Sequence, residues 1–387
     1  MPVRALSRVK IRSIEGSGLS TNFDVIVVGG GPAGAAAAIT CRRHGLRTLV
    51  LEASTNPGEQ PGETLHPGVE PLFCSLGVDV RVNKARFLRH PGYMVRSGNK
   101  STFVAYGSDH RGQWLGYQAD RSILHGILLE HASAKGAVVV RGERAVRPTL
   151  LDNAVGGVET RVGAYTSRFV VDAAGPTQWL RRQLRIPSFR VSTLLVARFG
   201  WFEQRDNLEV ESSMPEFCVS GYEWNWTAPV KASRYAWVNL NLMNERLANR
   251  LMPNGVAGQT PVSKLGASDV TWKIARPCAG PGYFMVGDAA WVLDPASSHG
   301  VLKAIMSGMI VADMIGRVLN DSGQIAHMQA SYCAWAEDQF CADAAALISL
   351  YSGMEKPPTW LSAGSEAVRY IARSPSARAF SSNPTRA

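Results

Sequence analysis

Three glycines near the N-terminus have the spacing of a loop that binds phosphates. Gly29, Gly31 and Gly34 form a G-x-G-x-x-G pattern between a β-branched run at residues 24–28 and an alanine-rich segment. Glycines at these places permit a tight turn, a close approach of the backbone to a pyrophosphate, and packing of a helix on a strand. The helix would direct unpaired N–H groups at the phosphates, and Glu52, eighteen residues after Gly34, would accept hydrogen bonds from a ribose. The pattern predicts a strand–helix–strand unit that binds a dinucleotide.

A second segment, GYFMVGDAAWVLDPASSHGVLKAIMSG at residues 282–308, also has a strand–turn–helix pattern. We expect a strand that ends before Gly287 and Asp288, a loop that contains Pro295, and a helix that begins near Gly300. The Asp288 carboxylate would accept hydrogen bonds from hydroxyl groups. The N–H groups at the start of the helix would stabilise a negative charge.

Four polar residues are candidates for proton transfer or for positioning a substrate. Glu63 and His66 lie in the segment PGETLHPG, and Ser298 and His299 lie just before the helix expected near Gly300. An imidazole with an ordinary pKa of ~6.5 donates or accepts a proton near neutral pH. For His66 the alternative is a loop histidine that only hydrogen-bonds to the backbone.

Two tryptophans in the segment YEWNWTAPV are candidates for contact with a substrate. Trp224 and Trp226 alternate, so in a strand their side chains lie on one face. Either they line a channel and stack on an aromatic ring, or they belong to the core. The sequence leaves both alternatives open.

The composition argues against several classes of protein. The 387 residues carry a formal charge of +10, but the basic residues are dispersed and are not interleaved with aromatic residues as in a nucleic-acid interface. The longest apolar run, at residues 25–39, contains glycines and a proline and is too short to span a bilayer. The six cysteines fall singly, without the spacing of a zinc site. We expect a cytoplasmic protein with reduced thiols, no metal, and no binding to nucleic acid or membrane.

The two glycine-containing segments, in this order, resemble the FAD signatures of the glutathione-reductase-type flavoproteins. In that family the aspartate at the Asp288 position meets the ribityl chain, and the helix after it faces the flavin. The segment GYQADRSILHGILLEHASAKGAVVV has Arg121 where the family has an arginine near the cofactor, and RFVVDAAGPTQWLRRQL contains a matching turn at residues 172–175. The cofactor-binding residues that the resemblance implies are Gly29, Gly31, Gly34, Glu52, Arg121, Asp172, Gly175, Gly287, Asp288, Pro295 and Gly300.

Over residues 23–351 the chain resembles the flavin monooxygenases of the para-hydroxybenzoate-hydroxylase-like superfamily. Within it, the branch of the tryptophan halogenases and geranylgeranyl-reductase-type enzymes is the most similar. PGETLHPGVEPLFCSLGV resembles the Gly-Glu loop near the isoalloxazine ring, and YEWNWTAPV resembles the W-x-W-x-I-P motif of the halogenases, with Ala228 in place of isoleucine. The resemblance implies that reduced FAD and O2 form a flavin hydroperoxide, which an electron-rich aromatic ring attacks.

One residue of the halogenase pattern is missing. Halogenases carry a lysine in a Phe-Lys-x-Gly segment after the Gly-Glu loop, where it meets hypohalous acid, but in NKARFLRHPGY the residue after Phe87 is Leu88. Lys84 stands before Phe87 and on another strand face if the segment is extended. Lys303, on the helix after Gly300, is expected to pack rather than react. The departure at Leu88 makes halogenation the alternative function.

GETLHPG and DPASSHGVLKAIMSG resemble the flavoproteins that mature cysteine tryptophylquinone enzymes, those of the lysine- and glycine-oxidase type and the quinohaemoprotein amine dehydrogenases. Halogenases have hydrophobic or aromatic residues where this chain has Ser297, Ser298 and His299. The implied function is an FAD-dependent monooxygenase that hydroxylates a peptidyl tryptophan of a partner protein during tryptophylquinone biogenesis. The charge of +10 would suit an acidic partner. The alternatives are a flavin-dependent halogenase or hydroxylase of a small aromatic metabolite, and a non-catalytic FAD-binding escort protein.

The electron donor is left open. The chain has no second G-x-G-x-x-G followed by an acidic residue, so a separate nicotinamide domain is not expected. Either NAD(P)H visits the flavin transiently, or a flavin reductase supplies free reduced flavin and is a second partner.

The sequence predicts an α/β fold with a glutathione-reductase-type FAD-binding Rossmann domain, an antiparallel β-sheet substrate domain and C-terminal helices. One helix or two are expected between Gln324 and Tyr351. Residues 1–20 are expected to be a disordered tail, with a transit peptide as the alternative. The expected divisions are 21–80, 116–184 and 280–319 for a discontinuous FAD-binding domain, 81–115 and 185–279 for the substrate domain, 320–373 for the C-terminal helical region, and 374–387 for a loose tail.

Overall fold

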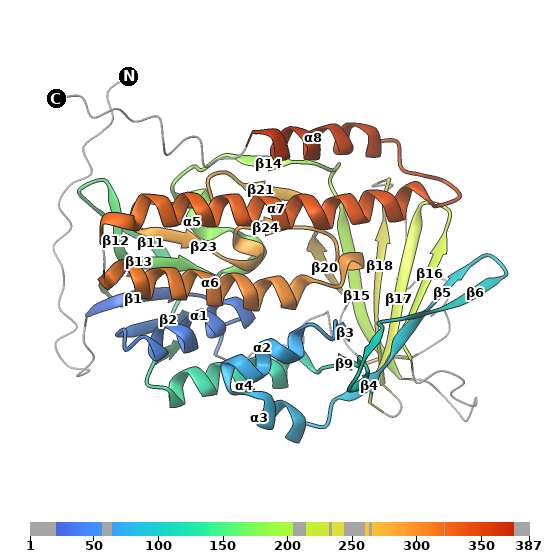
Figure 1. Ribbon diagram of the computed structural model, residues 1–387, viewed down its shortest axis with the longest axis horizontal. Helices are drawn as coiled ribbons and strands as arrows, with labels where there is room; N and C mark the ends of the chain where they lie inside the picture. The colour runs from blue at the N-terminus through green and yellow to red at the C-terminus, as the bar shows by residue number, and fades with distance from the viewer. Residues whose placement is uncertain are drawn as a thin grey trace.

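A computed structural model describes residues 21–55, 64–203, 214–231, 234–243, 260–262, 265–320 and 322–374. Two large sheets lie beside one another, and long helices run across them from one sheet to the other (Figure 1). The predicted α/β fold is confirmed. The expected tail at residues 1–20, and residues 375–387 of the expected tail at 374–387, lie outside the described residues.

The first large sheet has a parallel centre. Its strands run in the order β10-β2-β1-β13-β12-β11, and β23 also pairs with β13. Pairs among β10, β2, β1, β13 and β23 are parallel, whereas β12 is antiparallel to its neighbours β11 and β13. The bounds are β1 Asn22–Val28, β2 Thr48–Glu52, β10 Val138–Arg141, β11 Ala145–Leu151, β12 Ala154–Thr160, β13 Ala164–Asp172, β22 Ala279–Gly280 and β23 Tyr283–Met285.

Helices α1 (Pro32–Arg43) and α4 (Arg121–Ala134) pack on strands of this sheet, and α6 (Gly300–Asn320) packs on α1. The residues of β1 from Val25 to Val28 are buried without alternation, because both faces of a parallel sheet are covered. Helices α1 and α6 approach closely at Gly308, where an added Cβ would lie 2.2 Å from the carbonyl oxygen of Ala33. This contact brings the starts of both helices to the same end of the sheet.

The second large sheet is mostly antiparallel, as predicted, with the order β19-β15-β18-β17-β16-β5-β6 and with β20 paired to β15. The pair of β16 and β5 is parallel. The β5–β6 hairpin extends beyond the rest of the sheet in Figure 1. The bounds are β5 Gly92–Ser97, β6 Lys100–Ala105, β15 Val196–Glu203, β16 Glu216–Ser220, β17 Glu223–Lys231, β18 Arg234–Asn241, β19 Thr260–Pro261 and β20 Gly266–Asp269.

Smaller elements connect the two sheets. Short strands form three small sheets, β14-β21-β24, β3-β9-β4 and β7-β8. Their bounds are β3 Thr64–Leu65, β4 Leu88–His90, β7 Ser108–Asp109, β8 Gly112–Gln113, β9 Gly116–Gln118, β14 Ser188–Arg190, β21 Lys273–Ala275 and β24 Trp291–Val292. The remaining helices are α2 Val69–Leu76, α3 Asp79–Lys84, α5 Trp179–Gln183, α7 Ile325–Ser352 and α8 Leu361–Arg373, with 3-10 turns η1 Gly175–Thr177, η3 Gly287–Ala289, η4 Pro295–Ser297 and η5 Ser322–Gln324.

Between Gln324 and Tyr351, where the sequence left one helix or two open, the structure has one continuous helix, α7. It lies across both sheets in Figure 1. A buried ion pair fixes it to the loop before β22, because Arg276 Nε donates to Glu337 Oε1 at 2.9 Å. None of the helices in the described part of the chain is long and apolar enough to cross a membrane.

Candidate functional site

A large cavity of about 660 Å³ opens at the carboxyl ends of β1, β2 and β13. Ligands of open α/β sheets bind at this edge. The predicted cofactor-binding residues that line the large cavity are Gly29, Gly31, Glu52, Arg121, Gly175, Asp288 and Gly300.

The three glycines of the first motif have different surroundings. An added Cβ at Gly31, the residue before α1, would meet no atom within 4 Å, so this backbone faces open space in the large cavity. At Gly29, whose φ is +107°, a Cβ would lie 2.4 Å from the Ala173 oxygen. At Gly34 it would lie 1.9 Å from the Gly29 oxygen. Gly31 therefore provides a cradle for a ligand, and Gly29 and Gly34 allow backbones to pack.

Glu52 lies at the end of β2 and holds the glycine loop. Its Oε2 accepts from the Gly30 amide at 2.7 Å, and its Oε1 accepts from the Ser54 amide at 2.7 Å. A carboxylate has about four acceptor sites, so two remain for ribose hydroxyls at the cavity surface. The open cradle at Gly31 and this carboxylate fit the adenosine half of FAD.

Arg121 begins α4, and the Asp120 side chain caps this helix by accepting from the amides of Ser122 and Ile123. Arg121 Nε donates to His125 Nε2 at 3.2 Å. Burial, and then the charge of Arg121, lowers the pKa of His125 to about 3, so this imidazole is a neutral acceptor. The Arg121 guanidinium is thereby oriented on the wall of the large cavity.

Asp172, which was predicted to bind the cofactor, does not line either cavity. Its carboxylate is fully buried and accepts from the amides of Ala174 at 2.9 Å and Leu180 at 2.8 Å. Burial raises its pKa to about 6. Asp172 therefore shapes the turn that brings Gly175, with a φ of +66°, to the cavity surface.

A small cavity of about 210 Å³ adjoins the large one. The two share the wall residues Arg121, Pro176, Asp288, Gly300 and Val301. On the side of the second sheet, the small cavity is lined by Phe199, Phe217, Trp224, Trp226, Ala236 and Val238. The prediction that Trp224 and Trp226 lie on one face of a strand is confirmed, and both rings line this cavity.

Each indole N–H at the small cavity is bound within the protein. Trp224 Nε1 donates to Tyr351 Oη at 2.9 Å, and Tyr351 Oη donates to Asp294 Oδ1 at 2.8 Å. Burial raises the pKa of Asp294 to about 6. Trp226 Nε1 donates to Thr64 Oγ1 at 2.9 Å, and Thr64 Oγ1 donates to Gln118 Oε1 at 3.0 Å.

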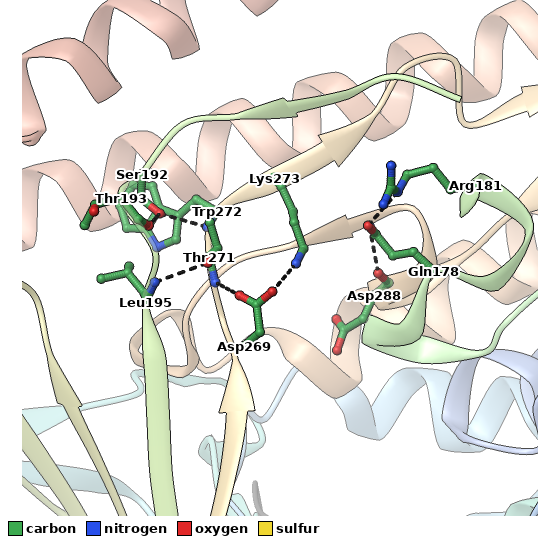
Figure 2. Close-up of polar contacts among 10 residues, drawn as sticks. All are labelled: Gln178, Arg181, Ser192, Thr193, Leu195, Asp269, Thr271, Trp272, Lys273 and Asp288. Atoms are coloured by element: carbon green, nitrogen blue, oxygen red, sulfur yellow. Dashed lines mark hydrogen bonds and ion pairs between the residues drawn. The ribbon is translucent and has the colours of Figure 1, made fainter. Parts of the chain in front are cut away.

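The opposite wall of the small cavity is polar. Asp288 on η3 pairs with Lys303 on α6, with 3.1 Å between Oδ1 and Nζ, and Lys303 Nζ also donates to the Trp291 carbonyl at 3.2 Å. Lys303 was expected only to pack, but its ammonium reaches this wall. Figure 2 shows Asp269 held by Lys273 and by the Thr271 amide, with the Asp288 side chain nearby. Asp269 and Asp288 both line the small cavity.

The structure brings the two candidate histidines together but does not place them in the small cavity. The rings of His66 and His299 are 5.5 Å apart, edge to face. His66 Nδ1 accepts from the Gly68 amide at 3.0 Å, as in the alternative of a loop histidine bound to backbone, and burial and then His299 lower its pKa. His299 Nδ1 lies 2.9 Å from Asp343 Oδ1.

Among the other candidates, Ser298 lines the small cavity in a left-handed conformation, with a φ of +54°. Pro295 lines the small cavity rather than the large one, and Gly34 and Gly287 lie behind the cavity walls. Glu63 lies outside the described residues.

The lysine position of the halogenase pattern has no counterpart at either cavity. Leu88 lies in β4 and is 41% exposed, and Lys84 is the exposed last residue of α3. The segment is helical rather than extended at Lys84, so the argument from strand faces does not apply there. Among the lysines of the described ranges, Lys303 is the one that lines the small cavity.

Sequence reasoning did not single out Tyr351, Asp294, Thr64 or Gln118. Tyr351 lies near the end of α7, 57 residues after Asp294 and 127 after Trp224. A tyrosine among the apolar residues of a helix gives no local signal of such distant contacts. Asp294 had a signal, since the side chain before Pro295 commonly caps a turn, and here it accepts from the Ala296 amide.

Comparisons with known proteins assign a family to residues 24–180 and find relatives of most of the chain. Residues 24–180 match the family model described as FAD dependent oxidoreductase. The chain is 25% identical to the tryptophan 2-halogenase of Chondromyces crocatus, covering 88% of this chain and 70% of the relative. It is 24% identical to the 1H-pyrrole-2-carbonyl-[peptidyl-carrier protein] chlorinase of Pseudomonas fluorescens, covering 78% and 77%. It is 25% identical to the digeranylgeranylglycerophospholipid reductase of Thermoplasma volcanium, covering 82% and 84%.

Solved structures of halogenases have the same fold. The myxobacterial chondrochloren halogenase CndH superimposes with a TM-score of 0.79 at 21% identity, covering 90% of this chain and 88% of that one. The flavin-dependent halogenase CmlS superimposes with a TM-score of 0.77 at 20% identity, covering 88% and 67%. The finer resemblance to the tryptophylquinone-maturing flavoproteins gains no support from these relatives. The chain is an FAD-dependent oxidoreductase, and its fold is that of the flavin-dependent halogenases.

Proposed function

We propose that this oxidoreductase is a flavin-dependent halogenase of a small, electron-rich aromatic molecule. The observation that carries the proposal is the small cavity, which has an aromatic wall and shares five wall residues with the large cavity. The halogenases among the relatives support the same assignment.

The residues of the large cavity fit FAD. Gly31 leaves space for phosphates, the Glu52 carboxylate accepts from ribose hydroxyls, and Arg121 supplies a positive charge. The start of α6 at Gly300 directs backbone N–H groups toward the shared wall. Bound and reduced, FAD would supply the electrons that activate dioxygen.

The small cavity selects for size and for aromatic character. Its volume of about 210 Å³ is below the roughly 300–1,000 Å³ of cavities that hold drug-sized ligands. A substrate of one or two rings would pack against Trp224 and Trp226, because aromatic pairs prefer stacked or edge-to-face contacts. The apolar side chains of the wall would exclude water from the reacting ring.

Lys303 provides an ammonium group on the polar wall. Its side chain is only 9% exposed, and its contacts with Asp288 and the Trp291 carbonyl fix its position. A buried ammonium attracts a halide or orients an electrophilic oxidant toward the ring. We assign this role to Lys303, since Leu88 stands where the halogenase pattern has its lysine.

Hydroxylation of a peptidyl tryptophan is the competing function. A protein-borne ring would need a wide approach, whereas a cavity of about 210 Å³ favours a free molecule. Ser298 and the His66–His299 pair would then serve as positioning or proton-transfer groups beside Asp294 and Pro295. Electrons would come from NAD(P)H or from a flavin reductase, which is the partner that we propose for either function.

The experiment uses the FAD-loaded chain with a flavin reductase, NADH, O2 and bromide. Free tryptophan, phenol and a tryptophan-bearing acidic protein are supplied separately, and the masses of the products are measured by mass spectrometry. We expect bromine on a free aromatic molecule and a loss of at least tenfold in brominated product for Lys303→Met. The exposed-lysine control Lys84→Met should match the wild type. Oxygen on the protein tryptophan, with free aromatics unchanged, would refute the proposal.

A further inference from the structure

We propose that Tyr351 is a positioning residue that determines the specificity of the small cavity. Through Tyr351, the buried Asp294 carboxylate holds the Trp224 indole in one orientation in the cavity wall. The inference rests on the proposed function in one respect, namely that the small cavity receives the aromatic substrate.

The donor and acceptor of each hydrogen bond between Trp224, Tyr351 and Asp294 follow from the chemistry of the three side chains. An indole N–H only donates, and an ionised carboxylate only accepts. The Tyr351 hydroxyl must therefore accept from Trp224 at 2.9 Å and donate its one hydrogen to Asp294 at 2.8 Å. A phenylalanine at this position would leave the buried Trp224 N–H without its acceptor.

Asp294 is a rigid anchor for these hydrogen bonds. Its Oδ1 accepts from Tyr351 and from the Ala296 amide at 3.0 Å, and its Oδ2 accepts from Trp272 Nε1 at 2.8 Å. The rings of Trp272 and Tyr351 also stack, with centroids 6.1 Å apart. Rotation of the carboxylate would break these bonds together, so Tyr351 has one stable position.

The anchored indole decides what the cavity offers to a substrate. Because the Trp224 N–H is bound behind the wall and the Trp226 N–H is bound by Thr64, neither indole donates to a ligand. The aromatic wall then recognises rings by shape and stacking alone. Polar groups of the substrate must face the opposite wall, where Ser298 and Lys303 lie. The orientation of Trp224 thereby sets which ring atom is presented to the shared wall.

Helix α7 thus helps to position the wall of the small cavity. Tyr351 is a residue of α7, while Trp224 lies on β17 and Asp294 lies in the loop before η4. The same helix contains a matched control, Tyr332, which is also fully buried. Tyr332 Oη donates to the Met285 carbonyl at 2.7 Å and has no bond to the cavity wall. Loss of the Tyr332 hydroxyl removes its buried hydrogen bond to the Met285 carbonyl, whereas loss of the Tyr351 hydroxyl removes its two bonds to Trp224 and Asp294, which line the small cavity.

The first test is independent of turnover. In the ¹⁵N-labelled holo chain, the indole N–H resonance of Trp224 is assigned by its loss in Trp224→Phe. In Tyr351→Phe we expect this resonance to move upfield in the proton dimension and its hydrogen exchange to accelerate at least tenfold. Tyr332→Phe should leave it unchanged. An unchanged resonance in Tyr351→Phe, or equal changes in both variants, would overturn the anchor.

The second test measures specificity with indole as the probe. Calorimetric titration should show at least fivefold weaker indole binding in Tyr351→Phe, with no change in Tyr332→Phe and FAD affinity equal in all three proteins. Where the wild type turns over free tryptophan, the ratio of positional isomers should change in Tyr351→Phe only. A wild type that binds no indole, or variants that bind it equally, would overturn the specificity role. A wild type that binds indole but forms no halogenated product would refute the proposed function and leave the positioning role supported.

Discussion

Adding a methyl group at two glycines of the first motif should have different effects: Gly31→Ala should weaken FAD binding, and Gly34→Ala should lower the stability of the fold. In Gly31→Ala the new Cβ meets no protein atom within 4 Å, so the apo fold accommodates it. It occupies the open space of the large cavity, where the proposal places the FAD phosphates. In Gly34→Ala the new Cβ would lie 1.9 Å from the Gly29 oxygen, so α1 must move away from β1.

The expected magnitudes follow from these contacts. A methyl group at Gly31 that displaces a phosphate from one backbone N–H loses a hydrogen bond to a charged group, worth about 1.5–3 kcal/mol. This corresponds to roughly a 10- to 100-fold weaker affinity for FAD. Overpacking at Gly34 should cost about 1–3 kcal/mol of unfolding free energy, because the clash is with backbone rather than with a flexible side chain.

The assays are urea unfolding of the apo chains and titration of FAD by fluorescence. Gly31→Ala should unfold within about 0.5 kcal/mol of the wild type and bind FAD weakly. Gly34→Ala should unfold at a lower urea concentration. If Gly31→Ala binds FAD as tightly as the wild type does, the assignment of Gly31 to the phosphate cradle is refuted. Equal destabilisation by the two substitutions would refute the packing argument.

Further predictions concern buried polar groups. The pKa of Asp294 rises from 3.8 to about 6 on folding, so this group stabilises the fold fully below pH 3.8 and its contribution, up to about 3 kcal/mol, is lost as the pH rises through 6. Urea unfolding between pH 4 and pH 7 should show this loss of stability in the wild type relative to Asp294→Asn. A difference between the two proteins that does not change with pH would refute the prediction. Glu337→Ala should destabilise the chain by about 3–5 kcal/mol, because it leaves the Arg276 charge buried, whereas Glu366→Ala on the surface of α8 should have little effect. Thr64→Val should weaken indole binding by removing the acceptor of the Trp226 N–H, and Thr64→Ser should restore it, which calorimetry can check.

The parts of the fold that depend on short stretches of sequence could be predicted. The first strand, α1 and the start of α6 follow from glycine spacing and apolar runs, and the structure has them within one or two residues of the expected bounds. Trp224 and Trp226 could be assigned to one face because alternation is a local property.

The rest depends on contacts between distant residues. Asp172 looked like a cofactor ligand because its motif is near the cofactor in the resembling family, but only the fold reveals that its carboxylate is turned away and buried. Tyr351 enters the site because a helix of 28 residues reaches from the first sheet to the second. From the sequence, Lys303 appeared to be a packing residue, because nothing near it on the helix indicates its ion pair with Asp288, which lies in a separate turn.

The most direct test of the central claim is the origin of the new atom in the product. The FAD-loaded chain is supplied with a flavin reductase, NADH, bromide and ¹⁸O2, together with free indoles and phenols, and the products are analysed by high-resolution mass spectrometry. The proposed function predicts a bromine isotope doublet on a free aromatic molecule that carries no ¹⁸O. A product with one ¹⁸O and no bromine would contradict halogenation and establish the chain as a hydroxylase.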